Sequence, residues 1–148
     1  MRTVVPVVVG SFLLAIVSCS SVTPVPIRAG DICEGCRRPI QNVKIAAEVV
    51  PPAGRLALKF RTVSCMARYL HGHGSTEGTV FVTDYQNGRF IQARSAIFVK
   101  SEIDENTREL DYYAFSDVSS AVAFGRKTGG TSIDWPGVVK VIAAAGAN

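Results

Sequence analysis

The stretch Phe60-Arg61-Thr62-Val63-Ser64-Cys65-Met66-Ala67-Arg68-Tyr69 decides the fold, because a similar stretch recurs later in the chain. The second copy is Phe115-Ser116-Asp117-Val118-Ser119-Ser120-Ala121-Val122-Ala123-Phe124. Phenylalanine, valine, serine and a terminal aromatic residue recur in the same register. Downstream, Gly78-Thr79-Val80-Phe81-Val82-Thr83-Asp84-Tyr85 resembles Gly130-Thr131-Ser132-Ile133-Asp134-Trp135. Each copy predicts a strand, a short helix, a glycine turn and a second strand.

The flanking sequence supplies the remaining elements. Further strand-like runs are those at 44–50, 55–60, 96–100 and 112–115. A final helix is expected from Val138 to Ala145, with Pro136 suited to its first turn. The sequence therefore predicts an α+β protein with two small homologous ββαβ-type units in tandem and a C-terminal helix. The units are expected at 31–88 and 89–148.

The two expected helices begin alike. Thr62 or Ser64 in the first copy and Asp117 in the second are residue types that cap helices. Because Val63 and Val118 occupy the same position in the repeat, we expect both to face the core.

The repeat also provides an internal comparison for one cysteine. Cys65 in the first copy corresponds to Ser120 in the second, so the same helical turn is expected to fold without sulfur. This favours a chemical role for Cys65. A buried cysteine that packs as a small apolar side chain is the alternative.

The N-terminus indicates where the protein resides. Arg2 is followed by an almost wholly apolar run from Val4 to Val17, too short to span a bilayer. Ile16-Val17-Ser18 before Cys19 matches the lipoprotein box of bacteria. We expect a signal peptide at 1–18, a lipidated Cys19 and a Pro/Ser-rich lipidated tether at 19–30.

The protein would then be anchored to the membrane by lipid and face the periplasm. Ser20, rather than aspartate, follows the cysteine, which favours the outer membrane in a Gram-negative cell. An uncleaved membrane anchor and a plain secretory signal are the alternatives.

Composition excludes several classes of function. Removing eighteen residues from 148 leaves 130, one ordinary domain or two very small ones that share a core. Arg2 is the one basic residue of the leader, so the mature balance is 15 − 12 = +3. No basic run with interleaved aromatic residues suggests nucleic acid. No serine–histidine–acid set or carboxylate pair suggests an enzyme.

Three cysteines remain once Cys19 is assigned to lipid: Cys33, Cys36 and Cys65. An odd number leaves one thiol over if a disulfide forms. The pair Cys33-Glu34-Gly35-Cys36 can turn both sulfurs to one side, as in a metal knuckle. A structural Cys33–Cys36 disulfide and a redox dithiol are the alternatives, although Pro39 disfavours a thioredoxin-type helix after the pair.

These segments together resemble the NosL family, copper-binding lipoprotein accessory proteins of nitrous oxide reductase assembly. The matching residues, over nearly all of the mature chain, are Cys19, Cys33, Cys36, Phe60, Ser64-Cys65-Met66, Tyr69-Leu70, Val82-Thr83-Asp84-Tyr85, Ala96-Ile97-Phe98-Val99, Ala114-Phe115 and the stretch from Ala121 to Gly130. The resemblance implies two homologous ββαβ-type units. It also implies delivery of Cu(I) to a periplasmic copper enzyme or to the factors that assemble it.

The chain departs from the family in its methionines. Arg37-Arg38 stands where family members carry Gly-Met, and the segment 105–111 lacks their Pro-Met-Gly. Apart from the initiator, Met66 is the only methionine. The expected metal ligands are Cys33, Cys36, Cys65, Met66, His71 and His73.

Two readings of these ligands stay open. Thiolate and thioether favour Cu(I), whereas cysteine–histidine sets also suit Zn(II). The histidines could instead be solvated loop residues. The competing function is a lipoprotein without metal that binds another envelope protein.

Overall fold

The computed structural model of the chain describes residues 22–52, 55–74, 77–104 and 106–146. The leader predicted at 1–18 and Cys19 lie outside these ranges. Within the described residues, no helix is both long and apolar enough to cross a membrane. In chain order the elements are η1 (Val43–Ile45), β1 (Ala47–Val50), β2 (Leu58–Phe60), α1 (Val63–Gly72), β3 (Thr79–Thr83), β4 (Phe90–Gln92), η2 (Ala93–Ser95), β5 (Ile97–Asp104), β6 (Glu109–Phe115), α2 (Val118–Thr128), β7 (Ser132–Ile133) and α3 (Trp135–Gly146).

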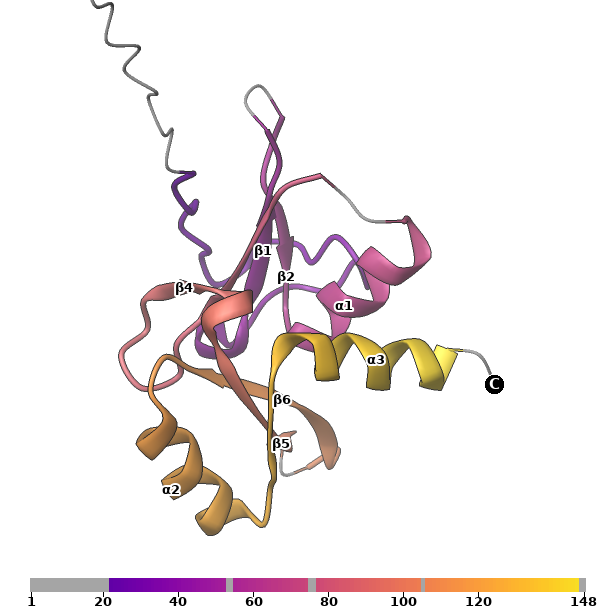
Figure 1. The fold of residues 1–148 in the computed structure, drawn as a ribbon. Helices are drawn as coiled ribbons and strands as arrows, with labels where there is room; N and C mark the ends of the chain where they lie inside the picture. Colours follow the sequence, from indigo (N-terminus) through magenta and orange to yellow (C-terminus); the bar gives the residue numbers. More distant parts are fainter. Residues whose placement is uncertain (1–21, 53–54, 75–76, 105, 147–148) are drawn as a thin grey trace, which may run out of the picture.

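The chain forms two small sheets and three α-helices, which confirms the predicted α+β class (Figure 1). The two halves share one topology. In the first sheet β1 lies between β2 and β3, and in the second sheet β5 lies between β6 and β7. All these pairings are antiparallel. A short 3-10 helix, η1 or η2, ends two residues before the central strand of each sheet begins. Each unit is therefore a ββαβ motif with a 3-10 turn in front.

The repeated residues occupy equivalent places. Phe60 is buried at the end of β2 opposite Ala47, and Phe115 is buried at the end of β6 opposite Ile97. Thr62 and Asp117 cap the helices that follow. The sequence repeat therefore reflects strand ends and helix starts, where the local geometry constrains residue type most strongly.

The first sheet extends beyond residue 88, the boundary expected between the units. Its edge strand β4 pairs with β3, with Phe90 opposite Thr83. The turn between them contains Gly88 at φ 72°, as the Asn87-Gly88 pair predicts. The two units are also joined by a parallel bridge between Asp84 and Ala114.

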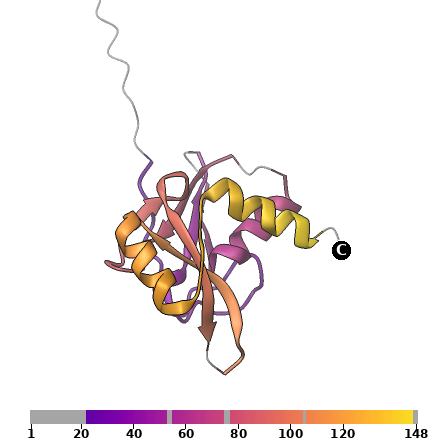
Figure 2. The same ribbon diagram turned by 60° about the horizontal axis from the view of Figure 1, so that its bottom comes forward.

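Both faces of the second sheet are covered. Phe98, Tyr112 and Ala114 face the main core, which also contains residues of the first sheet, α1 and α3. The alternate residues Val99 and Tyr113 face a smaller core under α2. Figure 2 shows α3 beside α1, while α2 lies apart from them. The main core is thus shared between the units.

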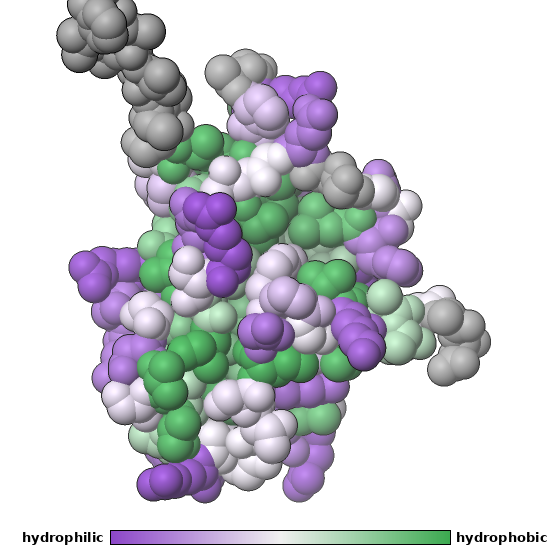
Figure 3. All heavy atoms as spheres, in the orientation of Figure 1, coloured by the Kyte–Doolittle hydropathy of each residue, from purple (hydrophilic) through white to green (hydrophobic). Residues whose placement is uncertain are grey.

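The expectation for Val118 is wrong. Val63 is 1% exposed, whereas Val118 is 65% exposed. α1 packs against β6 and α3, whereas α2 packs against the second sheet and Tyr85 and leaves its outer side to solvent. Figure 3 shows an apolar area over the start of α2, at the lower left. Equivalent positions in the two units therefore differ in burial, and the helices that carry them differ in their neighbours, since α1 packs against α3.

The described part of the expected tether contacts the first sheet. The Val25 N–H donates to Oε1 of Glu48 on β1 at 2.8 Å. Lys59 Nζ donates to the Pro26 carbonyl at 2.9 Å and pairs with Asp31 Oδ2 at 2.6 Å. The segment therefore covers the side of the first sheet on which Glu48 and Lys59 lie.

Candidate metal centre

A small hairpin carries the first two cysteines. Ile32 and Pro39 form an antiparallel bridge, and the Cys33 N–H donates to the Arg38 carbonyl at 2.9 Å. The Arg37 N–H returns to the Cys33 carbonyl at 2.9 Å and closes the turn. This turn places Cys33 and Cys36 on one side, as the spacing predicts.

Gly35 lets the hairpin approach α1. The Glu34 N–H donates to the Lys59 carbonyl at 2.8 Å, which attaches the hairpin to β2. A Cβ atom on Gly35 would lie 3.1 Å from the Cys65 carbonyl oxygen and 3.6 Å from the Phe60 ring. The glycine is therefore needed for close contact rather than for an unusual φ angle.

The first turn of α1 holds Cys65. The Thr62 hydroxyl accepts the Cys65 N–H at 3.2 Å. The buried Asp111 of β6 accepts the Ser64 N–H at 2.9 Å through Oδ1. Cys65 is consequently fixed by its own helix cap and by a carboxylate from the second unit.

The sulfurs of Cys33, Cys36 and Cys65 all lie within 4.8 Å of one another. All three are free cysteines; Cys33 and Cys65 are buried and Cys36 is half-buried. Three sulfurs around one ion at about 2.3 Å would lie about 4 Å apart. The cluster therefore needs a contraction of less than about 1 Å to hold a soft metal ion.

The thiols of Cys36 and Cys65 differ in their pKa values. For Cys36, desolvation raises the pKa. The Arg38 N–H, the neighbouring thiols and the charge of Arg61 outweigh it, so the pKa is lowered. For Cys65, burial raises the pKa to about 11, and the neighbouring cysteines add to this effect. Cys36 therefore loses its proton more readily than Cys65, and it is also the most exposed of the three cysteines.

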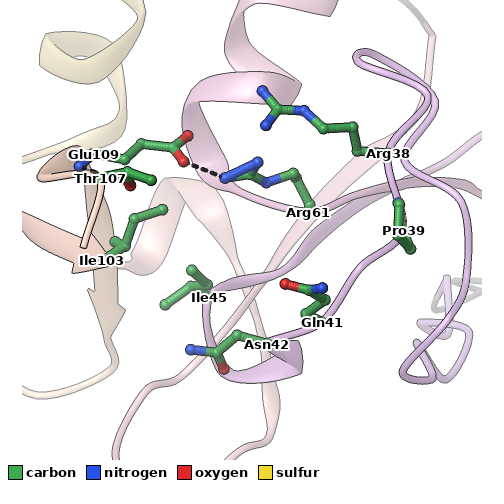
Figure 4. Close-up of a pocket in the computed structure, with 9 residues that line it drawn as sticks. All are labelled: Arg38, Pro39, Gln41, Asn42, Ile45, Arg61, Ile103, Thr107 and Glu109. Carbon is green, nitrogen blue, oxygen red and sulfur yellow. Dashed lines mark hydrogen bonds and ion pairs between the residues drawn. The ribbon is translucent and has the colours of Figure 1, made fainter. Parts of the chain in front are cut away.

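Arginines gather around the cluster. Arg68, one helical turn after Cys65, places Nη2 3.9 Å from its Sγ. Arg61 pairs with Glu109 at 2.6 Å, and Arg61 and Arg38 line a cavity of about 280 Å³ between the units (Figure 4). Arg37 pairs with Glu34 at 3.2 Å and has φ 59°, a left-handed conformation that disfavours a long side chain.

The two predicted histidine ligands lie outside the group of sulfurs. The ring of His73 stacks on Tyr69 with centroids 4.0 Å apart, and its Nδ1 lies 2.9 Å from the Tyr69 carbonyl. Both His71 and His73 are exposed at the end of α1, and neither shares the group formed by the cysteine sulfurs. Met66, next to Cys65 in the chain, is fully buried in the main core, which also contains Cys33 and Cys65. The structure thus brings together the three cysteines and keeps the histidines apart.

Sequence reasoning missed Asp111, Arg61 and Arg68 as parts of this site. Asp111 lies in a strand of the other unit, and no local pattern connects it with Cys65. The position of Arg68 beside Cys65 could have been predicted, because residues three apart on a helix share a face.

The structure is similar to the crystal structure of the copper chaperone NosL from Shewanella denitrificans. The TM-score is 0.63 at 18% sequence identity, and the match covers 77% of this chain and 93% of that chain. At this identity the similarity establishes a NosL-like fold. No family model and no curated protein matches the chain.

Proposed function

We propose that this protein is a lipid-anchored, periplasm-facing copper carrier that binds one Cu(I) ion through Cys33, Cys36 and Cys65. The observation that carries the proposal is the convergence of three cysteine sulfurs from two separate segments within 4.8 Å. Thiolate sulfur is the ligand type that selects Cu(I) over harder ions. The NosL-like fold supports the same conclusion.

The site suits transfer of an ion better than catalysis. Cys36 is half-buried, so an acceptor thiol or thioether can reach the metal at this edge while Cys33 and Cys65 still hold it. Copper then leaves by stepwise ligand exchange. The proposed acceptor is an envelope copper enzyme such as nitrous oxide reductase, or a factor that assembles it.

Metal titration tests the proposal. The full chain carrying Cys19→Ser, reduced and anaerobic, should bind about one Cu(I) per chain in competition with a chromogenic chelator. Cys33→Ser and Cys36→Ser should abolish tight binding, and Cys65→Ser should weaken it. Ser120→Ala is the matched control, because Ser120 occupies the position of Cys65 in the second unit, and it should leave the affinity unchanged.

Thiol counting separates this function from a disulfide-bonded interaction protein. Metal-loaded protein from the envelope, denatured with chelator, should yield three thiols besides the lipidated one. A count of one, with no uptake of copper after reduction, would contradict the carrier function.

A further inference from the structure

Four arginines, Arg37, Arg38, Arg61 and Arg68, lie on or next to the two segments that carry the cysteines, and two carboxylates balance only part of their charge. Glu34 pairs with Arg37 and Glu109 pairs with Arg61. Within the described part of the chain, Arg38 and Arg68 form no ion pair. The surroundings of the three sulfurs are therefore positively charged.

Arg68 acts directly on one of the sulfurs. The Arg68 guanidinium lies 3.9 Å from Cys65 Sγ through Nη2, within reach of a hydrogen bond to sulfur. Arg38 follows Cys36 by two residues, and its side chain lines the same cavity as Arg61 (Figure 4). Guanidinium stays charged at every pH at which the fold survives, so this field is permanent.

The formal charge of the loaded site depends on the ion. Three thiolates around Cu(I) leave two negative charges, whereas the same thiolates around Zn(II) leave one. A fixed positive field stabilises the more negative complex more strongly. The field is strongest where the site is partly shielded from water, as it is around the buried Cys33 and Cys65.

We propose that Arg38 and Arg68 determine the specificity of this site, selecting a monovalent soft cation over a divalent one through their charge. The inference rests on the proposed copper-binding function. It adds a reason why the site prefers Cu(I) to Zn(II), although the same ligands suit both ions. Arg68 is a positioning residue as well, since it donates to the sulfur of Cys65 without contacting the ion.

The test compares two affinities in one set of variants. Cu(I) and Zn(II) affinities are measured by chelator competition for the Cys19→Ser chain and for Arg38→Gln, Arg68→Gln and the double variant. Each lost charge should lower the ratio of Cu(I) to Zn(II) affinity by about tenfold. Arg68→Lys keeps the charge and should retain the ratio within about threefold.

Arg126→Gln is the matched control, because it removes the same charge from the last turn of α2, on the other unit. It should leave the ratio unchanged. Sulfur-to-copper charge-transfer absorption should show that every variant keeps thiolate coordination of copper.

Equal losses in both affinities, or an unchanged ratio in the double variant, would overturn the inference and leave the copper carrier standing. An unmodified cluster that binds neither ion would overturn both.

Discussion

At the residue scale, Glu48 is the most unusual side chain of the body. It is fully buried on β1, its Oε1 accepts the Val25 N–H, and its Oε2 has no hydrogen-bond partner among the described residues. Burial raises the pKa of this carboxyl to about 7, although the Val25 N–H and the charge of Lys59 oppose the shift. The folded protein therefore holds a proton that the unfolded chain has already lost above its ordinary pKa of 4.5.

Glu48 should make stability fall as pH rises. The folded state binds more protons than the unfolded state between pH 4.5 and about 7, so the contribution is complete below 4.5 and lost as pH rises through 7. The loss should amount to about 3 kcal/mol of the free energy of unfolding. Glu48→Gln should remove this part of the pH dependence and stabilise the protein at pH 8. Denaturant unfolding of both proteins at pH 5 and pH 8 measures it, and parallel pH profiles would contradict the assignment.

At the scale of elements, α1 and α2 begin with different caps although they occupy equivalent places. Asp117, the residue directly before α2, caps this helix and accepts the Ser119 and Ser120 N–H groups. α1 has Thr62 as its own cap and, in addition, Asp111 from β6, which accepts both the Ser64 and the Tyr112 N–H groups. The helix that carries Cys65 is thus held by the other unit.

Asp111→Ala should therefore impair both folding and metal binding. It removes the side-chain acceptor of the Ser64 and Tyr112 N–H groups, which should cost about 2 kcal/mol of stability, and it frees the first turn of α1. Copper affinity should fall as well, measured on protein that circular dichroism shows to be folded. Asp117→Ala, the equivalent change in α2, should lower the melting temperature and leave copper affinity unchanged. Equal copper affinity in the two variants would show that Asp111 does not position Cys65.

At the scale of the whole molecule, the body is expected to lie near a membrane. Val25 is hydrogen-bonded to Glu48 and stands 25 − 19 = 6 positions after Cys19. Six extended residues span at most about 20 Å. Lipid on Cys19 would therefore hold Val25, and the side of the first sheet that its segment covers, within about 20 Å of the headgroups.

Cys19→Ala should release the protein from the membrane fraction or leave an unprocessed precursor. The reason is that the lipid is attached through the Cys19 thiol, and two acyl signals are needed for stable anchoring. Fractionation followed by mass determination of the wild type and the variant measures this. A variant that stays in the membrane at the mature size would rule out the lipoprotein assignment.

The sequence by itself determined the repeat, the α+β class and the cysteine pair at the hairpin. These depend on local patterns: phenylalanine at a strand end, a capping residue two positions later, and two cysteines separated by two residues, one of them a glycine that permits close packing. Local sequence restricts backbone conformation directly, so such features can be read in one pass along the chain.

Only the tertiary structure decided which repeated residues are buried and which side chains surround the sulfurs. Val63 and Val118 are equivalent in sequence, but the packing of their helices against the rest of the protein buries only the first. Cys65 meets Cys33 and Cys36 because the hairpin attaches to β2, and Asp111 reaches α1 from the other sheet. His71 and His73 are closer to Cys65 in sequence than Cys36 is, yet α1 carries them away from its first turn. Distances between segments depend on how strands and helices pack, and sequence separation does not encode that packing.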